Sequence, residues 1–203
     1  MVEAAVVEEL RELIEALARE RARAAAVKGE SLDIHLHFYA DTPVIASAVP
    51  FPPATEAEIA EAEAALGRAY PPEYRALLSI ANGFPAYFIA DVLLGTHGVG
   101  THYSESIYGE HYPASAWGFA REYIDMWYSE GGDKPDHSPV DPSECVPLVY
   151  GTENMGTAYV VATDGADWKA NTVVHISSGG DVLFPSIRDY LRYGLDVSGT
   201  LYD

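Results

Sequence analysis

The chain has 203 residues, of which 48% are hydrophobic and 21% are charged, and this balance is typical of one globular domain rather than of a disordered chain. It carries 31 acidic and 12 basic side chains, a formal net charge of −19. Such an excess of acid argues against nucleic-acid binding, because phosphate neutralisation needs clustered Lys and Arg, and equally against an anionic membrane surface. Basic protein partners, cationic ligands and simple solubility all remain compatible with it.

The acid is unevenly distributed along the chain. Residues 1–28 hold six acidic and five basic side chains, so −18 of the net charge falls on residues 29–203. The single cysteine, Cys145, rules out an intramolecular disulfide and fits a reducing compartment. The sequence shows no signal-peptide pattern at its start, and no run approaches the about 18 apolar residues of a membrane span. We therefore expect a cytoplasmic protein.

Helical spacing of apolar residues predicts a long first helix, over about residues 3–27 and closed by Gly29. Residues 31–39 alternate between apolar and polar side chains, which predicts a half-buried strand. A proline-rich break over residues 43–53 follows. The apolar face of the helix must pack on the body of the protein or on a second copy of the chain, and it consists of Val6, Leu10, Leu13, Ile14 and Leu17.

Two helices are predicted after the break. Thr55 and Glu58 fit a capping box at the start of the first one, which ends at Gly67. The second helix follows a double proline, and Asn82-Gly83 is expected to stop it, since both residues tolerate the left-handed conformation.

The rest of the chain is predicted to be mainly strands and loops. Residues 86–94 are apolar enough for one buried strand, and Ser115 can cap a helix over about 116–129. Two long loops are expected at 96–112 and 130–144. Four short strands are predicted at 146–150, 157–163, 172–177 and 182–184. A last helix is predicted from Pro185 onward, with Ile187, Tyr190 and Leu191 facing inward. Helices at both ends of a run of hairpin-linked strands indicate an α+β fold, an antiparallel sheet covered by helices.

The segment Pro53–Gly83 resembles the signature of the SUKH superfamily, which is named in part for a yeast cell-wall assembly regulator. The pattern consists of a capped helix with a Glu before Leu-Gly, then a proline break, a Tyr-bearing helix and a closing Asn-Gly. Where the family usually has Leu before the proline, this chain has Tyr70. The matching residues are Ile59, Glu63, Leu66, Gly67, Pro71, Tyr74, Leu77, Leu78, Asn82 and Gly83.

The likeness continues in the C-terminal half, at Cys145–Leu148 and at Phe184-Pro185-Ser186 before a helix, and covers about residues 50–195. It implies two parts, an N-terminal helix-and-strand extension over residues 1–49 and a SUKH-like domain over residues 50–203. The matched residues are expected to build the fold rather than to bind a ligand.

The resemblance also implies a function. Most bacterial members resemble immunity proteins that bind one cognate toxin domain, often a nuclease, and block it, whereas fungal members resemble regulatory scaffolds. The family has no catalytic residue set, so no enzyme activity and no cofactor are expected. The leading hypothesis is an immunity protein for a basic toxin. The alternative is a non-enzymatic regulatory or scaffold protein, in which the first helix would serve docking or dimerisation. The chain would be a monomer, or a homodimer through that helix.

The two long loops are the predicted partner-binding surface. Tyrosine supplies rigid contact area, and carboxylates attract a basic partner by long-range electrostatics, as acidic inhibitors attract basic nuclease toxins. Solvation of exposed loops explains the same acids equally well. The residues singled out are Tyr103, Glu105, Tyr108, Glu110, Tyr112, Glu130, Asp133, Asp136, Asp141 and Glu144.

A third reading is a metal- or ligand-binding protein that uses histidines. His35 and His37 are two residues apart on a strand and so share a face, but no third ligand is marked by spacing. Irregular spacing also separates the loop histidines His97, His102 and His111. Structural or surface roles are expected for all of them, and no metal site is predicted. Cys145 lacks a basic neighbour in sequence and is predicted to be a buried thiol.

Overall fold

The structure is a computed structural model that describes residues 2–28, 33–36, 44–47, 49–88, 91–96, 144–150, 157–165, 168–177 and 180–201. In these residues, an antiparallel sheet is built in simple chain order, each strand pairing with the next. Its six strands are β3 (Phe84–Phe88), β4 (Asp91–Leu93), β5 (Cys145–Tyr150), β6 (Thr157–Val161), β7 (Val173–Ser177) and β8 (Gly180–Phe184). A separate hairpin pairs β1 (Asp33–Leu36) with β2 (Val44–Ser47).

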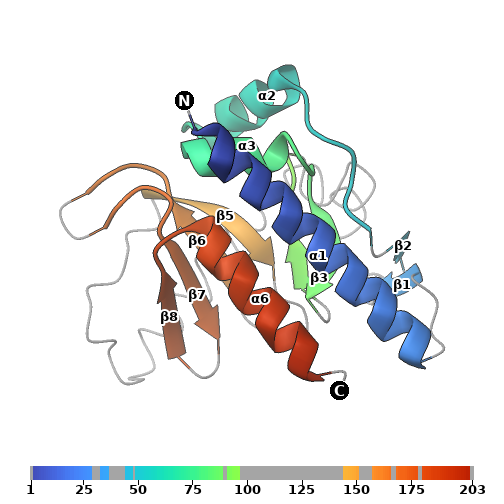
Figure 1. Cartoon of the computed structure of the whole chain (residues 1–203). Helices are drawn as coiled ribbons and strands as arrows, with labels where there is room; N and C mark the ends of the chain where they lie inside the picture. The colour runs from blue at the N-terminus through green and yellow to red at the C-terminus, as the bar shows by residue number, and fades with distance from the viewer. Residues whose placement is uncertain are drawn as a thin grey trace.

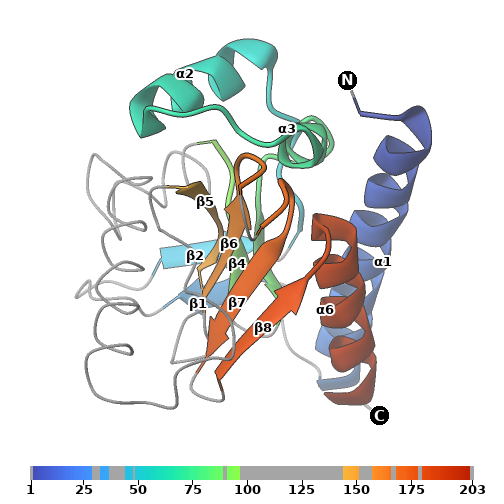
Figure 2. The ribbon, with the colours of Figure 1, turned by 90° about the vertical axis from the view of Figure 1, so that its left-hand side faces the viewer.

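Four helices accompany the sheet in the described part of the chain, and the α+β prediction is confirmed. They are α1 (Ala4–Lys28), α2 (Glu56–Leu66), α3 (Pro72–Leu78) and α6 (Ile187–Leu201). Helices α1 and α6 run side by side along one face of the sheet, while α2 and α3 lie across its end (Figures 1 and 2).

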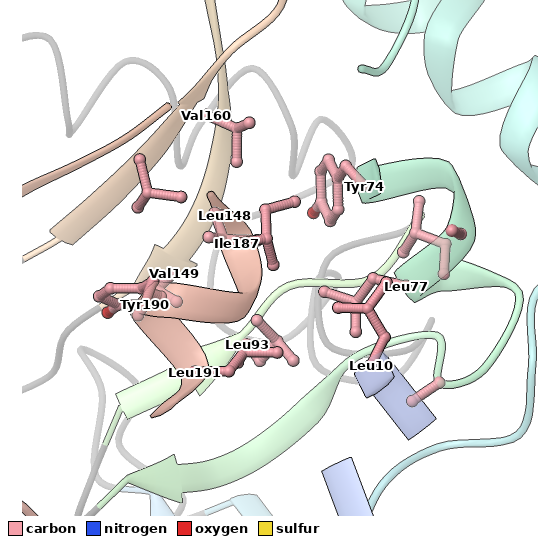
Figure 3. Close-up of a cluster of buried hydrophobic side chains, with 14 of the residues drawn as sticks. Leu10, Tyr74, Leu77, Leu93, Leu148, Val149, Val160, Ile187, Tyr190 and Leu191 are labelled. Carbon is pink, nitrogen blue, oxygen red and sulfur yellow. The ribbon is translucent and has the colours of Figure 1, made fainter. Parts of the chain in front are cut away.

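The main core lies between this helical layer and the sheet. Figure 3 shows Leu10 of α1 and Leu77 of α3 in the same cluster as Leu148 of β5 and Ile187 of α6. Each of these four side chains is almost fully buried. The apolar face of α1 is therefore used inside the chain, against α3, α6 and the sheet, and is not left open for a second copy.

The second face of the central strands is buried as well. Ala158 and Val160 of β6 belong to the core cluster, and their alternate neighbours Tyr159 and Val161 point the other way. Tyr159 and Val161 are nevertheless buried, as is Val174 of β7. Neither face of the central strands is thus open to solvent.

Local sequence signals locate most of the elements correctly. The α1 prediction holds, and the capping box is present, because the Glu58 N–H donates to the Thr55 side chain and the Glu58 carboxylate accepts from the Thr55 N–H. Gly67 ends α2 with φ +74°. The inward positions on α6 are also confirmed, since Ile187, Tyr190 and Leu191 are all buried.

Three predictions about residues 31–94 are wrong. The apolar run 86–94 is not one strand but parts of two antiparallel strands, β3 and β4, in which Phe88 pairs with Asp91. The break at 43–53 contains β2, which pairs with β1, a strand that lies within the predicted range 31–39. Helix α3 ends at Leu78 rather than at Asn82-Gly83. The predicted helix 116–129 and most of the two predicted long loops lie outside the described residues.

Candidate interaction surface

Glu63 joins α2 to α3. Its carboxylate accepts a hydrogen bond of 2.8 Å from the backbone N–H of Tyr70 and forms an ion pair of 2.6 Å with Arg75. Tyr70 is buried, and its ring lies 5.0 Å from that of Tyr74, centroid to centroid. Burial raises the pKa of Tyr70 well above its ordinary value, and the nearby Glu63 carboxylate adds to this. Tyr70 thus fills core space in place of the usual leucine and stays neutral.

Asn82 and Gly83 hold the chain against the end of β4. The Asn82 side chain accepts a hydrogen bond of 2.7 Å from the N–H of Thr96, and its amide donates one of 3.0 Å to the Thr96 hydroxyl. Gly83 has φ +100°, and a Cβ there would lie 3.0 Å from the backbone N of Gly95. This close approach explains the Asn-Gly pair, because no helix end lies here and only glycine tolerates both constraints.

Tyr74 links α3 to the same strand end. Its hydroxyl donates a hydrogen bond of 3.1 Å to the backbone carbonyl of Leu94. The residues of the SUKH-like pattern that have polar contacts in the structure therefore connect neighbouring segments.

A buried ion-pair clamp ties α1 to this framework. Glu73 of α3 is 5% exposed and accepts hydrogen bonds from both the backbone N–H and the Nε of Arg188 on α6, at 3.1 and 3.0 Å. The same guanidinium donates to Glu9 of α1 at 2.7 Å. The backbone N–H of Glu73 donates to Asn171, a residue with φ +71°. Three helices and the β6–β7 turn thus meet around the Glu73–Arg188 pair.

Intramolecular pairing engages most of the positive charge. Ten of the 12 basic residues and 18 of the 31 acidic residues lie in the described ranges. Within these ranges, exposed acids such as Glu12 and Glu61 form no ion pair, so the surface presents mainly negative charge. Seven of the ten bases form ion pairs with carboxylates, namely Arg11, Arg19, Arg23, Arg75, Lys169, Arg188 and Arg192.

Of the predicted partner-binding residues, Glu144 is the one that the structure describes. It is exposed, and its backbone carbonyl accepts a hydrogen bond of 2.8 Å from Ala162 beyond β6. Arg68, between α2 and α3, donates to the next carbonyl along, that of Cys145, at 2.6 Å. Glu144 therefore lies where β5, the β6–β7 turn and the α2–α3 connection meet. The other nine residues of the predicted surface lie outside the described ranges.

A second carboxylate, Asp164, is exposed in the adjoining β6–β7 turn. Its side chain accepts a hydrogen bond of 2.9 Å from the N–H of Ala170, and this bond, together with the nearby Lys169 ammonium, lowers the pKa of Asp164. Asp164 is therefore held in its charged form, so that Glu144 and Asp164 make this corner of the molecule anionic. We name Glu144 and Asp164 the β5 corner.

The other candidate sites find no support in the described residues. Cys145 is a free thiol, 3% exposed. No three His, Cys, Asp or Glu side chains in the described ranges are placed to hold a metal ion. His35 lies on β1, whereas His37, His97, His102 and His111 lie outside those ranges. No described helix has the length and apolar character needed to cross a membrane.

Comparison with known families tests the resemblance to the SUKH superfamily. The model of the SMI1 / KNR4 family (SUKH-1) matches residues 53–192 of the chain. The chain belongs to this family. The SUKH-1 match begins just before the capped helix α2 and ends within α6, so it contains the whole sheet and the Glu63, Tyr74 and Asn82 contacts. No curated protein matches the chain.

Proposed function

We propose that this SUKH-1 protein is an immunity protein that neutralises a cognate bacterial toxin domain by stoichiometric binding and has no catalytic activity of its own. The observation that carries the proposal is the family match over residues 53–192. Toxin immunity is the role that the resemblance implies for bacterial members, and the anionic surface supports a basic partner such as a nuclease domain.

The charge distribution supports the choice of partner. A nuclease needs a basic surface to bind its substrate. The acidic residues of this protein outnumber the basic ones, and most described bases already pair with carboxylates within the chain. Binding of a basic domain would therefore engage the surplus of carboxylates. We propose that the β5 corner and residues 130–143, which precede it in the sequence, form part of that surface.

A regulatory scaffold of the same fold is the second candidate, but one of its supports is weakened. The scaffold hypothesis uses the first helix for docking or dimerisation. The apolar face of α1 is instead buried in the core, and it consists of Leu10, Leu13, Ile14 and Leu17. A scaffold would have to use another surface.

Co-expression tests the proposal. The probe is a candidate cognate toxin domain, to be sought in the neighbouring genes and co-expressed with a tagged form of the protein. We expect a one-to-one complex on co-purification and survival of cells that otherwise die from the toxin. A well-expressed pair that forms no complex and gives no protection would overturn the proposal. If the neighbouring genes encode no toxin and the protein instead binds a different protein, the scaffold function would be favoured.

A further inference from the structure

The corner formed by β8 and α6 exposes an apolar surface. Val182 on β8 is 44% exposed and Tyr193 on α6 is 42% exposed, although most large apolar side chains of the described chain are buried. The Tyr193 ring packs on Phe184 with centroids 5.1 Å apart. Val182 and Phe184 share one face of the strand, because alternate residues point the same way. Val182 and Tyr193 thus lie on either side of the buried Phe184 ring, and we call these two exposed residues the β8 patch.

The β7 partner of Val182 places the patch on the α6 side of the sheet. Val182 pairs with His175 in the β7–β8 register. The His175 ring lies 5.8 Å from the ring of Tyr190, which projects from α6. Figures 1 and 2 show α6 between α1 on one side and the β7–β8 end of the sheet on the other. The patch is therefore on the flank of α6 that faces away from α1.

The β8 strand also offers hydrogen-bonding groups. Among the described strands it is one of the two edges of the sheet, which runs from β3 to β8 in order, and it is the edge beside the β8 patch. In an antiparallel ladder, alternate residues turn their N–H and C=O away from the partner strand. Such an edge is a template for one more strand, and the neighbouring Val182 and Tyr193 side chains would give that strand an apolar contact.

The charge around the patch is negative. Asp196 lies one turn after Tyr193 on α6 and is exposed. Arg192, which precedes Tyr193 in the sequence, is already paired with Glu9 and Asp189. A basic segment would find free carboxylate here, whereas a second copy of the chain, which also carries −19, would be repelled.

We propose that the β8 edge and the β8 patch form a docking surface for an extended, basic segment of a protein partner, which adds to the sheet as a further strand. The inference rests on the proposed function in identifying that partner as the toxin domain. Tyr193 would be the anchor of this interface, because exposed aromatic side chains dominate the binding energy of many interfaces.

A synthetic peptide tests the surface independently of the toxin. The probe is a blocked peptide of alternating Arg and Val, titrated into isotope-labelled protein, with a peptide of alternating Glu and Val as the matched control. We expect saturable amide shifts at residues 180–184 and 190–197 with the basic peptide, which weaken at high salt, and none with the acidic one. Shifts centred elsewhere, no shifts at all, or equal binding of both peptides would overturn the proposal.

The toxin domain provides the second arm. Val182→Lys changes an exposed side chain and should leave thermal unfolding nearly unchanged, whereas Tyr193→Ala removes a ring contact with Phe184 and should lower the unfolding temperature modestly while the protein still folds. Each should weaken the complex by about tenfold or more. Val27→Lys on α1, where the side chain is 66% exposed, is the matched control and should bind as the unmodified protein does.

The two arms separate the two claims. If the toxin domain binds and both patch variants bind it equally well, the patch is not its interface, and this inference fails while the proposed function stands. If the toxin domain does not bind the unmodified protein at all, the proposed function fails. The peptide titration alone then tests whether the β8 surface binds an extended basic segment.

Discussion

Two signature glycines have positive φ but differ in the space around them. A Cβ on Gly67 would meet no atom within 4 Å, whereas a Cβ on Gly83 would lie 3.0 Å from the N of Gly95 and 3.1 Å from the carbonyl oxygen of Leu93. We expect Gly67→Ala to lower the free energy of unfolding by about 1 kcal/mol, the cost of the left-handed backbone alone. Gly83→Ala should cost about 3 kcal/mol, since steric overlap is added.

Urea unfolding of both variants measures this difference. Each glycine serves as the control for the other, because the substitution and the sign of φ are the same. Equal losses would contradict the close packing of the 82–83 turn against the end of β4.

Tyr70 makes the stability of the protein depend on pH in alkali. Its pKa is raised above the ordinary 10.0 by burial and by Glu63, so above pH 10 the unfolded chain releases this proton before the folded chain does. The free energy of unfolding should therefore fall as the pH rises past 10. In Tyr70→Phe this contribution is absent, and the fall should be shallower. Unfolding curves for both proteins across this range provide the measurement, and identical slopes would show that Tyr70 ionises equally in both states.

At the scale of elements, α1 is an integral part of the core. Leu10 is fully buried among residues of the SUKH-1 region, although it lies far outside the matched segment. We expect Leu10→Ala to lower the free energy of unfolding by about 2–5 kcal/mol, as for other large core deletions. Val27→Ala, at an exposed position of the same helix, should have little effect.

Truncation tests the same element more severely. Removal of residues 1–28 deletes one side of the core and the Glu9 end of the ion-pair clamp. The remaining chain should lose its cooperative thermal transition. A truncated protein that unfolds as sharply as the full chain would contradict the role of α1.

Elements with strong local signals could be predicted from the sequence, and the others depended on tertiary pairing. The capping box at Thr55 and the helical period of α1 are properties of short segments. The division of the run 86–94 into β3 and β4 cannot be predicted from the sequence, because no Gly, Asn or Pro stands between Phe88 and Asp91. The charge of Asp91 within an apolar run was the available signal. Strand β2 was hidden because prolines surround it.

The two candidate surfaces, the β5 corner and the β8 patch, also differ in whether local sequence signals can predict them. Glu144 could be singled out because acids crowd the segment before it. The β8 patch could not, because Val182 has the appearance of a core residue in sequence, and its exposure follows from the position of β8 at the outside of the sheet. The contact of Tyr193 with Phe184 likewise requires the packing of α6 on the sheet.

For the whole molecule, the excess of acid predicts how a basic partner associates. With a net charge of −19 and most described bases paired internally, long-range attraction should speed the encounter. The association rate constant with the toxin domain should fall by about tenfold or more as ionic strength rises from well below to well above the physiological value, while the dissociation rate changes less. Stopped-flow mixing measures both rates. An association rate that does not respond to salt would show that the acid serves solubility rather than recognition.

We propose that this SUKH-1 protein blocks a toxin by forming a stoichiometric complex with it. The decisive experiment is to titrate the purified protein into a fixed amount of a candidate cognate toxin domain and to measure the remaining toxin activity. We predict that activity falls in proportion to the added protein and is abolished at one equivalent, with no loss of the protein over time. Activity that persists in the presence of excess protein, or that is abolished by far less than one equivalent, would contradict the account.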